Sequence, residues 1–432
     1  YRFRHSLFQA YLYQQLDPVE RAQRHAAVGL ALEDLYVGQP GERARHAAEL
    51  ARHFEIGGLP VKAAAYHLKA GRQAVYLASP QGAVAHYRHG LALLAEQPRA
   101  PARDRLEIHL HLALGAPFLS ANGWGGPERR EAIQQALALL QATDPQPLDV
   151  KRDDLLLALH AQADWLLSQG ELEPAAQLGA QLLTLVGGHA SLPGALAHRI
   201  LGTSFLFQGR FPEARQHLKD ALAVYRAVGQ PDTLPWTGGD LQATCQVLLG
   251  FVLAVSGYLD QAWTQASQAL NRARYIKYPS SLGTTLIFAC EVAVLRGDLP
   301  ALDALAGELL RVGQTEGLHF FLAYGWAAQG YVQARRARPG SAQAKASEDL
   351  IRRGMRMWES TATQAGIGMW IVRLADACLQ AGDIAAGLAI TTEILATPTQ
   401  PGIGAGLSHI YRLHGELLLR HETPDRRAAE AY

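Results

Sequence analysis

Two stretches of the chain carry the same pattern of small and large residues. The first is LGTSFLFQGRFPEARQHLKDA at residues 201–221, and the second is LGFVLAVSGYLDQAWTQASQA at residues 249–269. Both open on Leu–Gly, have a glycine at the ninth place and have alanines at the fourteenth and twenty-first, so each position lies 48 residues from its match. Recurrence of several positions at one spacing indicates a repeated structural unit.

Each unit fits a pair of antiparallel helices. Apolar residues recur at spacings of three and four, which is typical of amphipathic helices rather than strands. The small residues let two helices approach closely, and the glycine between the helices permits the chain to reverse. One such pair cannot bury its own apolar face, but a stack of pairs can. We therefore predict an all-α superhelix, a solenoid of antiparallel helix pairs.

Further glycines extend the array along the chain. The turns are expected at Gly170, Gly209, Gly257, Gly297 and Gly382, which are 39, 48, 40 and 85 residues apart. The last interval corresponds to about two units, and residues 337–340 supply the turn between them. A weaker copy of the pattern lies at residues 70–87, and Asp17 followed by Pro18 has the features of a helix start.

Composition restricts the class of protein. The 432 residues are 49% hydrophobic and carry 40 Lys and Arg against 39 Asp and Glu, a formal net charge of +1. This balance argues against direct binding of nucleic acid or of an anionic membrane surface. The three cysteines are widely spaced and fit a reducing compartment, so we expect a cytoplasmic protein. Apolar runs are too short for a transmembrane helix.

Catalytic motifs are missing from the sequence. None of the six lysines follows a glycine, so no phosphate-binding P-loop is present. The zinc-protease pattern His-Glu-x-x-His and the nucleophile pattern Gly-x-Ser-x-Gly are also missing. Cys245, Cys290 and Cys378 fall on expected first helices and are predicted to be core residues. We expect this chain not to be an enzyme.

Two histidine pairs were considered for chemistry. His86 and His89 are three residues apart on one helical face, where they could share a metal, but the sequence shows no third ligand and favours surface histidines. His160 and Asp164 are four apart, which allows a hydrogen bond or ion pair along a helix and only weakly supports catalysis. No metal site is predicted.

The chain resembles two related groups of proteins. The helix pairs resemble tetratricopeptide repeats (TPRs), stretched from the usual period of about 34 residues to 39–48. The N-terminal residues are similar to the tail of the winged-helix region in bacterial STAND-type signalling ATPases; the matching residues are 1–7, 11, 16, 21, 25, 32–33, 47–54 and 70–74. Later segments resemble the TPR half of predicted ATPases that accompany class III adenylate/guanylate cyclase domains; these segments are 257–262, 278–282, 325–327 and 411–419.

The resemblance implies a regulator with other domains outside this chain. Residues 1–58 would end a winged-helix or helical linker region, and residues 59–432 would form a TPR-like array that is cut at its C-terminal end. ATP or ADP with magnesium would bind an ATPase domain of the parent protein, before residue 1, and this chain would hold no cofactor. That ATPase domain is then a possible partner. His5 matches a winged-helix histidine that can contact the phosphate of bound ADP, so it is a nucleotide-sensing candidate.

In a TPR-like stack the first helices line the concave face, and counting from each turn places particular side chains there. The concave-face candidates for binding a ligand or partner are His160, Asp164, Arg199, Thr203, Phe207, Phe251, Glu291 and Asp376. They combine apolar and acidic groups with one arginine, which suits an extended peptide or a helix. The alternative is that they only pack the inner seam of a tightly wound solenoid. Trp124 and Trp236, in expected loops, would anchor a partner or plug gaps.

Three functions follow from these observations. The leading hypothesis is a non-enzymatic sensor or scaffold that binds a protein or peptide on its concave face and regulates an upstream NTPase switch. The alternative is a small-molecule receptor whose cavity inside the superhelix is lined by Phe207, Phe251, Arg199 and Asp164. A weak third is an enzyme that uses His160 and Asp164.

Overall fold

The computed structural model describes residues 6–77, 79–122, 125–142, 148–229, 239–364, 366–396, 404–421 and 426–430. His5, Trp124 and Trp236 lie outside the described residues, so their assignments stay predictions. Within the described residues the chain is built of α-helices and one short 3-10 helix, with no β-strand. The predicted all-α class is confirmed.

The chain divides into two compact units. Unit 1 comprises residues 1–117 and 134–154, and unit 2 comprises residues 118–133 and 155–432. The winged-helix assignment of residues 1–58 stays a prediction. Three helices, α8 (Gly115–Asn122), α9 (Pro127–Ala142) and α10 (Leu148–Ser168), contribute to both units. The helices of unit 1 are α1 (Ser6–Gln15), α2 (Pro18–Leu35), α3 (Pro40–Arg45), α4 (Ala47–Ile56), α5 (Pro60–Tyr76), α6 (Pro80–Ala95) and α7 (Pro101–Ala113).

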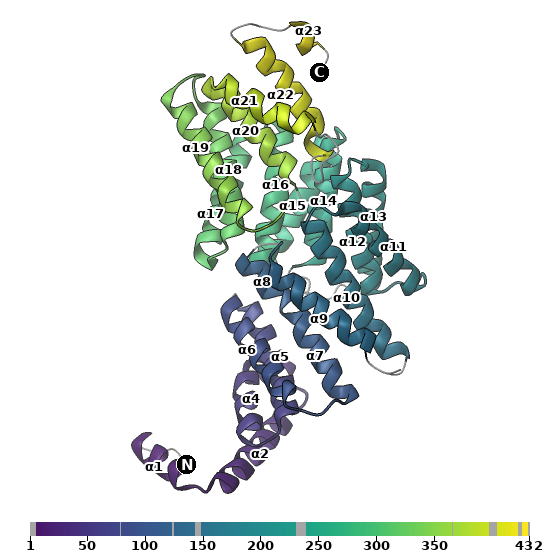
Figure 1. The fold of residues 1–432 in the computed structure, drawn as a ribbon, viewed down its shortest axis with the longest axis vertical. Coiled ribbons are helices and arrows are strands. Elements are labelled where there is room, and N and C mark those ends of the chain that lie inside the picture. The colour runs from purple at the N-terminus through teal and green to yellow at the C-terminus, as the bar shows by residue number, and fades with distance from the viewer. Residues whose placement is uncertain are drawn as a thin grey trace. The chain divides into compact units, whose positions relative to one another are not determined.

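Unit 2 is a run of helical hairpins. Its helices are α11 (Leu172–Val186), α12 (Leu192–Phe207), α13 (Phe211–Ala227), α14 (Leu241–Val255), α15 (Leu259–Ile276), α16 (Pro279–Arg296), α17 (Leu299–Glu316), α18 (His319–Arg336), α19 (Ala342–Glu359), α20 (Ile367–Ala381), α21 (Ile384–Ala396), η1 (Gly404–Gly406), α22 (Leu407–Arg420) and α23 (Arg426–Ala429). Within this unit the hairpins from α12 to α21 follow one another in chain order, from teal to yellow-green (Figure 1). The first helices α12, α14, α16, α18 and α20 also pack against each other in sequence, which makes one continuous inner wall.

The predicted turns are confirmed. Gly209 and Gly257 have φ values of +80° and +86°, and the other three predicted turn glycines also adopt positive φ. A side chain would be strained in this left-handed region, so glycine is required for the reversal. Asp17 caps α2 by accepting a hydrogen bond from the Val19 backbone N–H at 2.9 Å.

The weaker repeat in unit 1 is confirmed as a helix pair of the same kind. A Cβ atom at Gly71 of α5 would lie 2.2 Å from the ring of Tyr87 on α6. The same construction at Gly202 of α12 meets Leu218 on α13 at 2.7 Å. Both glycine and partner are displaced by 131 residues between the two pairs. Close approach of the two helices is therefore built in the same way in both units.

The three cysteines are core residues, as predicted. Cys245, Cys290 and Cys378 lie on the first helices α14, α16 and α20, and each is fully buried. Burial raises the pKa of each thiol to about 12. Among the described helices, none is both long enough and apolar enough to cross a membrane.

Candidate functional site

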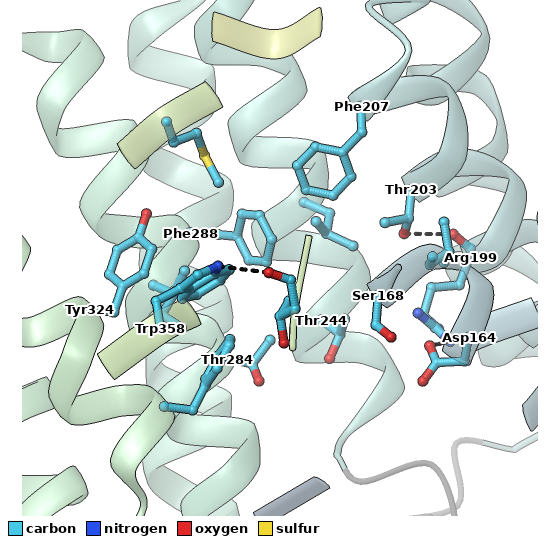
Figure 2. A pocket seen from close by; sticks show the side chains of 16 residues that line it. Asp164, Ser168, Arg199, Thr203, Phe207, Thr244, Thr284, Phe288, Tyr324 and Trp358 are labelled. Atoms are coloured by element: carbon cyan, nitrogen blue, oxygen red, sulfur yellow. Dashed lines mark hydrogen bonds and ion pairs between the residues drawn. The ribbon is translucent and has the colours of Figure 1, made fainter. Parts of the chain in front are cut away.

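The inner wall of unit 2 encloses a cavity with mainly apolar sides. Including the open solvent at its mouth, the cavity has about 680 Å³ of empty space. Figure 2 shows the rings of Phe288, Tyr324 and Trp358 on one side, with Phe207 at the top and Asp164 on the opposite side. The lining residues are Asp164, Leu167, Ser168, Arg199, Thr203, Phe207, Thr244, Leu248, Thr284, Ile287, Phe288, Phe320, Tyr324, Trp358, Thr363 and Met369. We call this the apolar cavity.

A buried charge cluster forms the polar end of the apolar cavity. Arg199 donates to Asp164 at 2.7 Å and approaches the His160 Nε2 atom at 3.0 Å. A second guanidinium, from Arg129 on α9, donates to the other oxygen of Asp164 at 2.5 Å. Each of these four side chains is buried. The cluster links α9, α10 and α12 and fixes the position of Arg199.

Electrostatics keeps the members of this cluster in defined protonation states. Burial would raise the pKa of Asp164, but the guanidinium groups of Arg199 and Arg129 outweigh that effect and hold its pKa below its usual value. Burial, assisted by the positive charge of Arg199, lowers the pKa of His160 to about 3. At neutral pH the cluster therefore has an ionised aspartate, two arginines and a neutral imidazole. His160 and Asp164, which the sequence considered as a pair, are both held by Arg199.

The superhelix closes on itself beside this cavity. The Gln364 backbone N–H donates to the Ser168 carbonyl at 2.8 Å, and the Gln169 side chain donates to the Ala362 carbonyl at 3.1 Å. These bonds join the end of α10 to the turn after α19, almost 200 residues later in the chain. Ala362 has a φ of +51°, an unusual value for a residue with a side chain. The cavity is thus bounded by the winding of the array.

A second cavity lies further along the same wall and shares Met369 with the first. Its empty space is about 750 Å³ with open solvent included. The lining residues are Phe251, Val255, Glu291, Val294, Leu295, Tyr331, Met369, Val372, Arg373, Asp376, Gly406, His409 and Arg412. We call this the charged cavity, because it contains two buried carboxylates and a buried guanidinium.

Arg373 is the central group of the charged cavity. It is 1% exposed and forms an ion pair with the buried Glu291. It also donates to the Tyr324 hydroxyl at 3.1 Å, with its guanidinium 4.7 Å from the centre of the Tyr324 ring. The Nε and Nη1 atoms of Arg373 are buried and have no hydrogen-bond partner among the described residues. Burial raises the pKa of Glu291, and the positive charge of Arg373 opposes this rise.

The structure brings the eight predicted concave-face residues to this wall. Asp164, Arg199, Thr203 and Phe207 line the apolar cavity, where His160 contacts Arg199. Phe251, Glu291 and Asp376 line the charged cavity instead, so Phe251 does not share a cavity with the other predicted receptor residues. Each of the eight is buried.

The expected acidic character of the wall is wrong. Each predicted acidic residue has an arginine beside it: Asp164 has Arg129 and Arg199, Glu291 has Arg373, and Asp376 has Arg335 at 3.5 Å. Counting positions from the turns found only Arg199. Arg129 lies on a helix before the first counted turn, and Arg373 lies one place after the inward position that was counted. The aromatic residues Phe288, Tyr324 and Trp358 were missed for the same reason.

Comparisons with known proteins agree with this architecture. No protein-family model matches the chain, and no curated protein matches its sequence. The fold is similar to that of a Rap protein complexed with Competence and Sporulation Factor, with a TM-score of 0.52 and 9% identity over 83% of this chain and 99% of that chain. It is also similar to NprR in complex with its cognate peptide NprX, with a TM-score of 0.52 and 11% identity over 77% of this chain and 89% of that chain. At such identities the similarity shows the fold, a TPR-like helical solenoid.

Proposed function

We propose that this chain is a non-enzymatic sensor domain that binds an extended peptide or protein segment along the inner wall of unit 2. The observation that carries the proposal is the pair of adjoining cavities on that wall, one apolar and one with a buried arginine that has two unpartnered N–H groups. A buried donor without a partner costs about 1–3 kcal/mol. A ligand that supplies an acceptor to Arg373 would recover this energy.

The chemistry of the two cavities defines the ligand that fits them. Aromatic and aliphatic walls in the apolar cavity suit a large apolar side chain. Arg373 suits a carboxylate or a main-chain carbonyl, both of which accept hydrogen bonds from a guanidinium. An extended segment with an apolar anchor and a nearby acceptor group can use both cavities. Peptide binding by the structurally similar NprR, in complex with its cognate peptide, supports this choice.

A peptide selection tests the proposal. A displayed library of random short peptides is panned on the purified chain, and selected peptides are measured by fluorescence anisotropy. Arg373→Met should weaken binding by about tenfold or more, since one charge-assisted hydrogen bond contributes about 1.5–3 kcal/mol. Arg311→Met, on the exposed side of the second helix α17, is the matched control and should bind as the parent chain does. Failure to select any peptide, or equal loss in both variants, would contradict the proposal.

A small-molecule receptor is the second candidate function. The volume of the apolar cavity, about 680 Å³ with its mouth, falls in the usual range for ligand pockets. A small apolar ligand would use this cavity alone. Its binding would raise the melting temperature of the chain, and Arg373→Met would leave that shift unchanged while Phe207→Ala reduced it. This pattern separates a small ligand from a peptide that spans both cavities.

The proposed role in a longer protein is the restraint of an ATPase switch. The support is the resemblance of the N-terminal residues to STAND-type signalling ATPases, with His5 as the candidate nucleotide contact. In such a protein ATP or ADP and magnesium would bind the ATPase domain, and a bound peptide would relieve or impose the restraint. The test compares ATP hydrolysis by the parent protein with and without residues 59–432. An unchanged rate would contradict this part of the proposal and leave peptide binding standing.

A further inference from the structure

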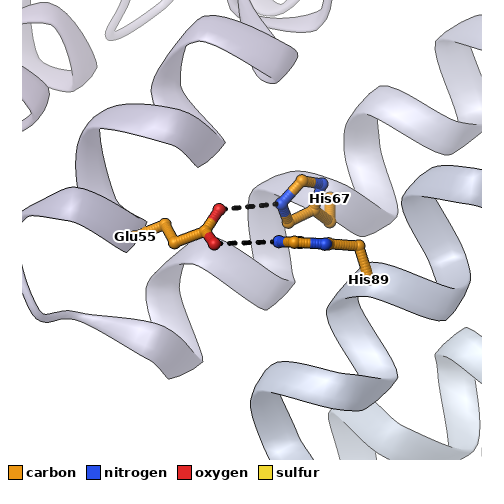
Figure 3. A group of neighbouring side chains, drawn as sticks. All are labelled: Glu55, His67 and His89. Carbon is orange, nitrogen blue, oxygen red and sulfur yellow. Dashed lines mark hydrogen bonds and ion pairs between the residues drawn. The ribbon is translucent and has the colours of Figure 1, made fainter.

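Four polar side chains from three consecutive helices meet in unit 1. Glu55 comes from the end of α4, His67 from α5, and His86 and His89 from α6. Figure 3 shows the Glu55 carboxylate facing the rings of both His67 and His89. The sequence showed only His86 and His89 as neighbours; folding adds His67 and Glu55.

The distances in this cluster are those of a set of metal ligands. The Glu55 carboxylate lies 3.0 Å from His89 Nε2 through Oε1 and 3.8 Å from His67 Nε2 through Oε2. The three ligand atoms all lie within 4.8 Å of one another. Ligands of a tetrahedral zinc ion, each about 2.1 Å from the metal, are about 3.4 Å apart. The two measured carboxylate–imidazole distances bracket this value.

His67 has a ligand atom available. Its side chain is 10% exposed, and its Nε2 atom is buried with no hydrogen-bond partner among the described residues. Its other ring nitrogen, Nδ1, is 3.1 Å from His86 Nδ1, so one of the two carries a hydrogen and donates it. When His67 donates, its Nε2 presents a lone pair toward Glu55 and His89. Such fixing of a histidine tautomer by a neighbour is common at metal sites.

The charge state also suits a metal. Burial, with smaller contributions from His89 and His86, lowers the pKa of His67 to about 4, so the ring is neutral at pH 7. A neutral nitrogen and a carboxylate that face each other without a hydrogen between them have no attraction. A divalent cation between them would bind both. Glu55 and His89 are partly exposed, with side chains 37% and 47% accessible, so they can move by the fraction of an ångström that closing on an ion requires.

We propose that Glu55, His67 and His89 bind a Zn²⁺ ion, with His86 orienting His67. Two imidazoles and one carboxylate form a common zinc ligand set and leave a fourth position for water. The ion would connect α4, α5 and α6. This makes the site a metal-dependent clamp on the first helix pair of the chain.

A second histidine pair in unit 2 provides an internal comparison. His198 and His217 lie 131 residues after His67 and His86 and have the same Nδ1-to-Nδ1 contact, at 3.0 Å. Asp220 takes the place of His89 there. Neither imidazole of this pair has a buried nitrogen without a partner in the described part of the chain. The pair is therefore the control that shares the packing of the proposed site but lacks the free ligand atom.

The test is zinc binding by the untagged full chain after treatment with a chelator. We expect isothermal titration with Zn²⁺ to give one site per chain, and Co²⁺ to give the visible absorption of a tetrahedral complex. Zn²⁺ should raise the melting temperature, whereas Mg²⁺ and Ca²⁺, which prefer oxygen ligands, should not. His89→Ala and Glu55→Gln should each weaken binding by about tenfold or more.

Controls decide between outcomes. His198→Ala should bind zinc as the parent chain does, and far-UV circular dichroism of each variant confirms that it is folded before titration. Saturable binding that survives both His89→Ala and Glu55→Gln, or that is lost in His198→Ala, would overturn the assignment. So would the absence of saturable binding to the parent chain.

Discussion

A Cβ atom placed on Gly354 would lie 2.6 Å from the carbonyl oxygen of Ala323. The two residues belong to α19 and α18, which form one hairpin, and both are buried. Real Cβ atoms do not approach backbone oxygen this closely, and a backbone atom cannot rotate away as a side chain can. The approach of the two helices in this hairpin therefore depends on the absence of a side chain at residue 354.

We expect Gly354→Ala to destabilise unit 2 by about 1–3 kcal/mol, the usual cost of forcing an extra carbon into a packed core. Gly307→Ala is the matched control, since Gly307 is also helical but nothing lies within 4 Å of its Cβ position. That change should stabilise the chain by up to about 1 kcal/mol, through helix propensity alone. Urea denaturation followed by circular dichroism measures both, and equal effects would contradict the packing argument.

A second prediction concerns the pairing of Asp164 with Arg199. Asp164→Asn leaves two buried guanidinium groups without their anion and should cost about 3–5 kcal/mol. Arg199→Gln removes one of the two positive partners, and the double variant should be less destabilised than the sum of the single changes. A double-mutant cycle in urea reads this coupling. Simple additivity would show that Arg199 does not interact with Asp164 in solution.

The depressed pKa of His160 predicts acid sensitivity. Its pKa is 6.5 when unfolded and about 3 in the folded chain, so the unfolded state binds more protons between these values. The stability contributed by the neutral ring is complete above pH 6.5 and declines as pH falls, by about 1.4 kcal/mol per pH unit, until about pH 3. His160→Gln should reduce the slope of stability against pH between 6.5 and 4. His189→Gln, at an exposed histidine, should leave the slope as it is.

The buried cysteines predict slow reaction with thiol reagents. Only the thiolate reacts, and burial raises the pKa of Cys245, Cys290 and Cys378 to about 12 while also excluding the reagent. The native chain should release almost no chromophore from a disulfide reagent at pH 7.5, and three equivalents after denaturation. Rapid native labelling of any of the three would show that unit 2 opens readily around that helix.

The sequence predicted the fold because the features that decide it are local. A turn glycine such as Gly209 and its neighbouring small residues recur in the sequence at readable spacings, so helix pairs and their order followed directly. The site was predicted only in part. Arg373 meets Glu291 across 82 residues, and Glu55 meets His89 across 34. No spacing rule connects such pairs, because they depend on how successive hairpins stack. The sequence identified the inward helices but could not identify the arginines that neutralise them.

The pair of Arg373 and Glu291 separates binding from packing as the purpose of the inner wall. Removing either partner alone should cost about 3–5 kcal/mol, because the other is left as an uncompensated buried charge. Replacing both, as Arg373→Met with Glu291→Leu, should restore stability to that of the parent chain or raise it by about 1–4 kcal/mol. If the pair serves packing only, the double variant also keeps the affinity for selected peptides. We expect it to be stable in urea but to lose peptide binding, because Met offers no hydrogen-bond donor to the ligand. A stable double variant with unchanged peptide affinity would show that the pair fills the seam of the solenoid and that recognition occurs elsewhere.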